Sequence, residues 1–118
     1  MASKYEKGMD GQQIAEAFLI GKGYVVKDKN YRLRSGEIDL VVAHRGYVIF
    51  VEVKYRRGLT HGYPREAVTY GKQQKIQKTA LHYVYTRGLG DADMRFDVVE
   101  VLEMNGEVMV NHIENAFP

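Results

Sequence analysis

Two strongly apolar segments, residues 37–43 and 48–54, are separated only by the short sequence His44-Arg45-Gly46-Tyr47. Apolar residues, several of them β-branched, make up most of both segments, which is typical of mostly buried β-strands. The short connection containing glycine predicts a tight turn, so the two segments are expected to be antiparallel neighbours in one sheet. This hairpin constrains the fold more than any other feature, because it fixes two strands and their pairing together.

Charged side chains interrupt both predicted strands. Asp39 has apolar neighbours in the first strand, Glu52 has apolar neighbours in the second, and Lys54 follows Glu52 two positions on. Side chains two apart on a strand point to the same face, so Glu52 and Lys54 share one. A hairpin loop of two or four residues would set Asp39 opposite Glu52 on that face. A loop of three residues would put the two carboxylates on opposite faces.

Opposed carboxylates repel each other, because directly paired residues have Cβ atoms about 4.5–5.5 Å apart. A divalent cation would compensate for this repulsion, and Mg²⁺ is often held by one or two carboxylates together with waters and phosphate. Such a site suits phosphodiester hydrolysis, with Lys54 positioning water or neutralising charge on the phosphate. The alternative is a structural ion pair between Lys54 and one acid, with the other acid hydrated at a strand end.

The remaining segments predict the order helix, three strands, helix, two strands. The other elements are expected as helices over residues 8–21 and 66–86, and strands over residues 24–32, 95–101 and 107–112. Asp10 is a predicted helix N-cap, and Asn105-Gly106 is a typical two-residue hairpin turn. The long helix has an expected apolar stripe of Val68, Ile76, Ala80, Leu81 and Val84. The chain is therefore expected to be one α/β domain, residues 1–118, with helices covering a mixed central sheet.

The absence of cysteine excludes a disulfide framework and a thiolate metal site. The sequence has no apolar run long enough to cross a bilayer and no secretory signal, so a cytoplasmic protein without a membrane partner is expected. The net charge is only +2, but basic residues cluster locally at Arg56 and Arg57 and along the long helix at Lys72 and Lys75. These groups are candidates for phosphate contacts, and the alternative is a solvated charged surface.

The motifs together resemble those of the YraN-like family of small bacterial proteins, which belongs to the PD-(D/E)XK nuclease superfamily. The resemblance rests first on Gly36-Glu37-Ile38-Asp39-Leu40, Phe50-Val51-Glu52-Val53-Lys54 and Arg56-Arg57. It continues through Gly62, Glu66-Ala67-Val68, Lys72, Lys75, Arg95-Phe96-Asp97-Val98-Val99 and Asn115-Ala116-Phe117. The resemblance implies a restriction-endonuclease-like core in which Asp39 and Glu52 bind Mg²⁺ or Mn²⁺ and Lys54 is the catalytic lysine.

The implied activity is cleavage of DNA, including branched or structured nucleic acid. The residues expected to contact nucleic acid are Arg32, Arg56, Arg57, Lys72 and Lys75. Cutting both strands together would require a homodimer, and residues 107–112 are a candidate strand for edge pairing. The alternative is a binding or docking module that kept the fold and lost turnover.

One position departs from the family pattern. Gln12 stands in the first helix where the family usually has a metal-binding Glu, and Glu16 lies one turn later on roughly the same face. The resemblance therefore implies Gln12, or Glu16 in its place, as a third metal ligand. A neutral amide at this position is expected to weaken metal binding.

Overall fold

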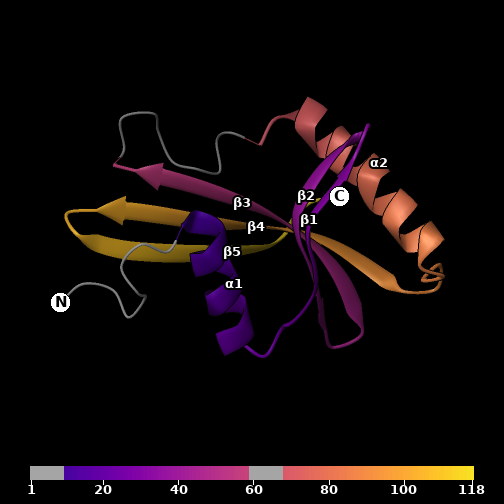
Figure 1. Ribbon diagram of the computed structural model, residues 1–118, viewed down its shortest axis with the longest axis horizontal. Helices are drawn as coiled ribbons and strands as arrows, with labels where there is room; N and C mark the ends of the chain where they lie inside the picture. The colour runs from indigo at the N-terminus through magenta and orange to yellow at the C-terminus, as the bar shows by residue number, and fades with distance from the viewer. Residues whose placement is uncertain (1–9, 59–67) are drawn as a thin grey trace.

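The computed structural model describes residues 10–58 and 68–118, and it has the α/β architecture and the element order predicted from the sequence (Figure 1). The elements are α1 (Gly11–Gly21), β1 (Val25–Leu33), β2 (Gly36–His44), β3 (Tyr47–Arg57), α2 (Tyr70–Thr86), β4 (Asp93–Met104) and β5 (Glu107–Phe117). The strands form one sheet in the order β1-β2-β3-β4-β5. The strand predicted for edge pairing belongs to β5, which is an edge strand, and the homodimer stays a prediction.

The β2–β3 hairpin turns through the two residues Arg45 and Gly46, with φ angles of 50° and 86°. Positive φ at both central positions is the geometry of the two-residue hairpin turn that matches strand twist. His44 accordingly pairs with Tyr47, so the loop has two residues, which is one of the two lengths that set Asp39 and Glu52 on the same face. β3 and β4 are parallel, and the chain between them includes α2, as a parallel connection requires.

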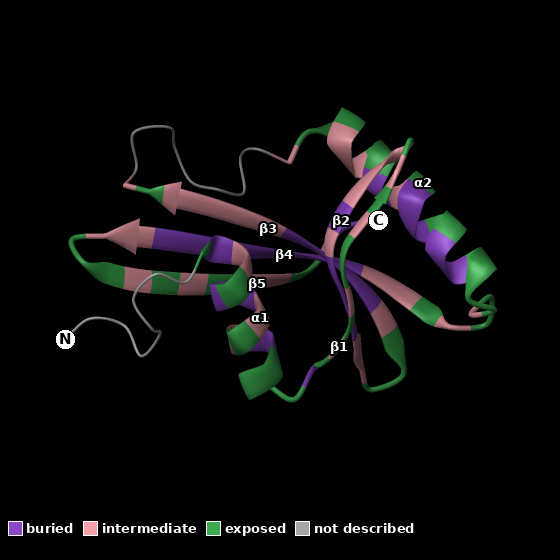
Figure 2. Cartoon of the chain, viewed as in Figure 1, coloured by how far each residue is buried: buried purple, intermediate pink, exposed green. Residues whose placement is uncertain are grey.

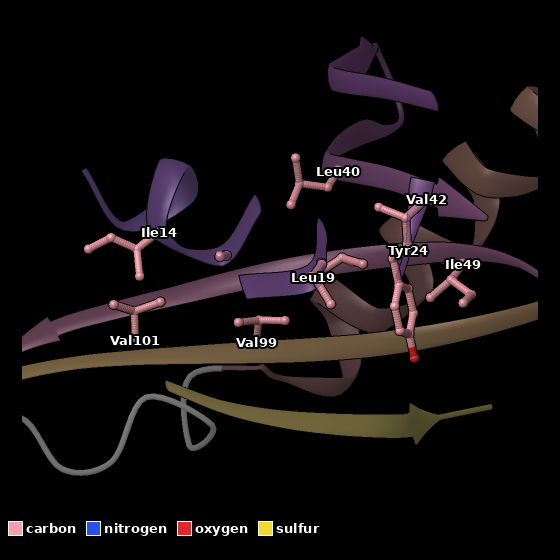
Figure 3. Packing of buried hydrophobic residues seen from close by; sticks show 10 residues of the cluster. Ile14, Leu19, Tyr24, Leu40, Val42, Ile49, Val99 and Val101 are labelled. Atoms are coloured by element: carbon pink, nitrogen blue, oxygen red, sulfur yellow. The ribbon is translucent and has the colours of Figure 1, made fainter. Parts of the chain in front are cut away.

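The two helices cover opposite faces of the sheet. On β3, Ile49 and Val51 pack in the cluster that contains residues of α1, whereas Phe50 between them packs in the cluster that contains residues of α2. This alternation follows from the two-residue period of a strand. Figure 3 shows the α1 cluster, and Figure 2 shows β4 buried along its middle because both helical layers meet it. The site described below lies on the α2 face.

Asp10 is the N-cap of α1, as predicted, so the helix begins at Gly11; the predicted start at residue 8 lies outside the described residues. The Asp10 side chain accepts a hydrogen bond from the backbone N–H of Gln13, whose side chain accepts in return from the backbone of Asp10. Gly11 then lies so close to β3 that an added Cβ would be 2.7 Å from the Cβ of Tyr55. A glycine at this position therefore lets α1 rest directly on the sheet.

Two expectations for the long helix differ from the structure. Helix α2 begins at Tyr70 with Thr69 as N-cap, so Val68 is not helical; the predicted start at Glu66 lies outside the described residues. Thr69 sets this start, because its side chain accepts from the Lys72 N–H and its own backbone is extended. Leu81 is 61% exposed, because it follows buried Ala80 and so falls about 100° away around the helix.

The strands extend beyond their predicted ends. β3 continues through Arg57, and β5 continues to Phe117, where the sequence pattern placed ends at Lys54 and His112. None of the helices in the described residues is long and apolar enough to cross a membrane.

Candidate active site

Strands β2 and β3 separate at Asp39. Their ladder runs from the turn as far as the pair Leu40–Val51, and the next pair in this register would be Asp39 and Glu52. Instead, the Asp39 carboxylate accepts a hydrogen bond from the backbone N–H of Val53 at 2.8 Å. The separation of the strands leaves room for a site at the two acids.

A cavity of about 150 Å³ occupies this position, between the β2–β3 hairpin and the first turns of α2. It is lined by Gly36, Glu37, Asp39, Glu52, Lys72, Lys75 and Ile76. The helix is fixed over it by a hydrogen bond of 2.8 Å between Ser35 and Thr79 and by its close approach to Gly36. The cavity thus brings together four of the residues that the sequence analysis singled out, namely Asp39, Glu52, Lys72 and Lys75.

Glu52 is the centre of the charge arrangement. Its carboxylate is buried, and its Oε2 contacts the ammonium groups of both Lys54, at 3.1 Å, and Lys72. Lys54 comes from the same strand and is itself largely buried, whereas Lys72 reaches down from the first turn of α2. A buried carboxylate needs such partners, because an uncompensated buried charge is costly.

The negative charge of Asp39 is compensated less completely by its neighbours than that of Glu52. Burial raises the pKa of Asp39 to about 7, with a further contribution from the neighbouring Glu52, and the Val53 N–H opposes some of this shift. Asp39 therefore takes up and releases its proton near neutral pH. A cation bound beside it would favour the charged form and release that proton.

Lys54 and Lys72 both contact Glu52, but their pKa values are shifted in opposite directions. Burial and contact with Lys72 lower the pKa of Lys54, and Glu52 opposes this effect only incompletely. Burial also disfavours the charged form of Lys72, but its contact with Glu52 outweighs burial and raises the pKa of Lys72. Lys54 is therefore the lysine that more readily gives up a proton.

Two acidic residues near the site were missed in the sequence analysis. Glu37 lines the cavity and accepts a hydrogen bond from Arg32 Nε at 2.8 Å. Its position two residues before Asp39 on the same strand was a signal that strand alternation provides. Glu100 is buried on β4, directly beside Lys54 in the parallel ladder, and accepts from Asn111 at 2.8 Å. No local pattern indicates this neighbour, because the connection from β3 to β4 passes through a helix.

The other predicted contacts lie apart from the cavity. Arg57 lies 3.6 Å from Glu103 at the far end of β3, and Arg56 Nη1 donates to the carbonyl of Tyr55. Gln12 is half-buried on α1, and Glu16 lies 3.4 Å from Lys29. The residues that line the cavity include none from α1. The third metal ligand implied from this helix therefore stays a prediction.

Asp97 belongs to a separate network of contacts between β4 and β5. Arg95 donates two hydrogen bonds to its carboxylate at 2.9 and 2.8 Å, and His112 Nε2 lies 2.7 Å from it. Burial alone would raise the pKa of Asp97, but contacts with His112, Arg95 and the Asn115 N–H hold it below its usual range. This acid joins β4 to β5, away from the cavity.

The donor set restricts the kind of divalent-metal site that the cavity can form. Within residues 10–58 and 68–118, no group of three or more His, Cys, Asp or Glu side chains is arranged to hold a metal ion. Asp39 and Glu52 supply two carboxylates at one cavity. This set fits Mg²⁺ or Mn²⁺ bound through carboxylates, waters and a substrate phosphate, and it does not fit a metal held by protein ligands alone.

Comparison with known proteins identifies relatives along nearly the whole chain. The family model described as "Uncharacterised protein family UPF0102" matches residues 11–101. A UPF0102 protein of Clostridioides difficile is 43% identical over 112 residues, covering 95% of this chain and 96% of the relative. A UPF0102 protein of Clostridium novyi is 41% identical, covering 93% of each chain. A third, from Rhodococcus jostii, is 38% identical over 118 residues, covering 99% of this chain and 100% of the relative.

Proposed function

The chain belongs to the UPF0102 family, the YraN-like family that its motifs resemble, and we propose that it is a metal-dependent nuclease. It hydrolyses phosphodiester bonds in DNA, including branched or structured nucleic acid, with Mg²⁺ or Mn²⁺. The observation that supports this most is the cavity where Asp39 and Glu52 meet beside Lys54 and Lys72. The resemblance to PD-(D/E)XK nucleases implies the same roles for Asp39, Glu52 and Lys54.

Each side chain has a role in this proposal. Asp39 and Glu52 would hold the metal, which when bound would polarise a phosphoryl oxygen and make a bound water more acidic. Lys54 orients the attacking water, and its uncharged amine accepts the proton that the water loses. The lowered pKa of Lys54 favours this role. Lys75, with Arg32 nearby, meets the phosphate backbone at the edge of the cavity, where positive charge provides most of the affinity for nucleic acid.

The second candidate is a nucleic-acid-binding or partner-docking module that does not cleave. Two observations favour it. Gln12 brings no charge to the site. Asp39 and Glu52 line the cavity with Glu37, but no three such side chains among the described residues are arranged to hold a metal ion. In this case the lysines would bind phosphate, and Asp39 and Glu52 would serve only to position them.

Cleavage of a panel of single-stranded, duplex and branched DNA with Mg²⁺ and Mn²⁺ tests the proposal. Wild type is compared with Glu52→Ala and with Glu103→Ala, a matched control at a carboxylate that lies with Arg57 instead of at the cavity. We expect metal-dependent cutting by wild type and by the control, and none by Glu52→Ala. Absence of cutting by pure wild type on every substrate would contradict the proposal that the protein is a nuclease. Activity gained by Gln12→Glu would then identify the missing carboxylate as the cause.

A further inference from the structure

Two ammonium groups contact the same carboxylate oxygen of Glu52. Lys54, on the same strand, lies 3.1 Å from Oε2 and forms an ion pair with the carboxylate. Lys72 also contacts this oxygen. Two ammonium groups on one carboxylate repel each other, and in a partly buried site that repulsion is stronger than in water. The second ammonium therefore occupies a position that suits a cation of higher charge.

The place of Lys72 in its helix makes this arrangement more unusual. It is in the first turn of α2, where its N–H donates to the N-cap Thr69. The N-terminus of a helix carries partial positive charge, so a lysine there is unfavourable. The first turn of α2 contains no acidic residue to offset this effect. Glu52 is thus the group that holds the Lys72 ammonium near the helix start.

The two lysines also differ in how easily they can leave. The Lys54 side chain is 13% exposed and stands on a strand within the sheet, whereas the Lys72 side chain is 42% exposed at the mouth of the cavity. A long lysine side chain with that exposure can swing from Glu52 into solvent, or towards a phosphate, by changing rotamers alone. Lys54 has no comparable freedom.

We propose that Lys72 is a built-in placeholder for the divalent cation, holding the position beside Glu52 in the metal-free protein and giving it up when metal binds. The released ammonium then contacts a phosphate of the nucleic acid. This inference rests on the proposed metal-dependent function. It adds that metal and nucleic acid bind cooperatively, because a phosphate that attracts Lys72 away from Glu52 opens the metal position, and such coupling is reciprocal.

Binding of Mn²⁺ to the metal-free full-length protein, followed through the electron paramagnetic resonance of the free ion, tests the proposal without any assay of cleavage. The variants are Lys72→Met, which removes the ammonium, and Lys72→Arg, which keeps a cation. Lys78→Met is the matched control, because it removes the same charge from an exposed position of the same helix that does not line the cavity. Thermal unfolding without metal verifies that each variant is folded, and Lys72→Gln replaces Lys72→Met if that variant is not.

We expect Lys72→Met to bind Mn²⁺ on the order of tenfold more tightly than wild type, because a competing unit charge has been removed from the ligand. Lys72→Arg should stay near wild type and Lys78→Met within about twofold, since an exposed charge outside the cavity is screened by solvent and salt. A short DNA duplex should tighten Mn²⁺ binding to wild type and have a smaller effect on Lys72→Met.

Two other results would overturn the proposal and can be told apart. If wild type binds Mn²⁺ but Lys72→Met binds no more tightly than Lys78→Met, Lys72 is not a placeholder, while the metal site itself stands. If neither wild type nor Lys72→Met binds Mn²⁺, with or without the duplex, the metal-dependent function fails together with the placeholder.

Discussion

The carboxylate of Asp39 accepts a hydrogen bond from the backbone N–H of Val53, at 2.8 Å, at the point where β2 separates from β3. The bond holds Asp39 beside Glu52 without bringing a positive charge to it. Asp97 has two cationic or potentially cationic partners, Arg95 and His112. The two strand aspartates are thus held in opposite electrostatic states, one with a raised pKa and one with a lowered pKa.

We predict that Asp39→Asn stabilises the metal-free protein at pH 8. The folded-state pKa of Asp39 is raised from 3.8 to about 7, so the stability that its proton contributes is complete below pH 3.8 and is lost as the pH rises through about 7. Asparagine stays uncharged at every pH, so the variant does not lose this stability when the pH rises. It should therefore add about 1–3 kcal/mol to the free energy of unfolding at pH 8. Urea unfolding in EDTA at pH 5 and pH 8 measures the effect, which should be smaller at pH 5. A variant less stable than wild type at pH 8 would contradict the predicted repulsion.

Divalent metal should raise the melting temperature of wild type and leave that of Asp39→Ala unchanged. A ligand that binds only the folded state stabilises it, by about 2.7 kcal/mol at a hundred times its Kd. The increase should be larger at pH 8 than at pH 6, because metal must displace the Asp39 proton, whose pKa is about 7. Differential scanning fluorimetry with Mg²⁺ and Mn²⁺ measures it. An equal shift in wild type and variant would assign the metal to another site.

Lys75→Ala should weaken binding of every nucleic acid by a similar factor. Lys75 lines the cavity, and one lost phosphate contact makes the negative slope of log affinity against log salt shallower by about 0.9. Lys78→Ala, one turn further along α2, is the control, and its slope should match that of wild type. Fluorescence anisotropy of a labelled duplex over a range of salt concentrations gives both slopes. Equal slopes in all three proteins would place the phosphate contact elsewhere.

Asp97→Asn should destabilise the fold by about 3–5 kcal/mol, because it leaves Arg95 and His112 without their shared buried carboxylate. The lowered folded-state pKa means that the wild-type contribution is present above pH 3.8 and is lost as the pH falls through the folded value. Denaturant unfolding at pH 7 and pH 3 measures both effects. The melting-temperature shift caused by metal should survive in this variant under conditions where it is folded, since Asp97 lies away from the cavity.

The sequence alone predicted the elements that depend on local pattern. Apolar composition marked the two hairpin strands, whereas the loop length that sets their register was left open and was decided by the two-residue turn at Arg45-Gly46. Local pattern was less reliable at the start of α2 and at Leu81, because helix ends depend on the capping residue and an apolar side chain need not face the sheet. The β2–β3 ladder has the register in which Asp39 and Glu52 would be the next pair, but it ends at the pair Leu40–Val51 and does not include them.

The tertiary structure alone decided which distant groups meet at the acids. Lys72 reaches Glu52 because the chain crosses over the sheet between β3 and β4, and Glu100 lies beside Lys54 because those two strands are parallel neighbours. Periodicity and turn type act over a few residues, so they determine faces and register. They carry no information about which helix turn packs over which strand. The position of the helix over the strands depends on the packing of the whole core. This packing forms the cavity at the two acids of the hairpin and brings Lys72 to its mouth as a second lysine beside Lys54.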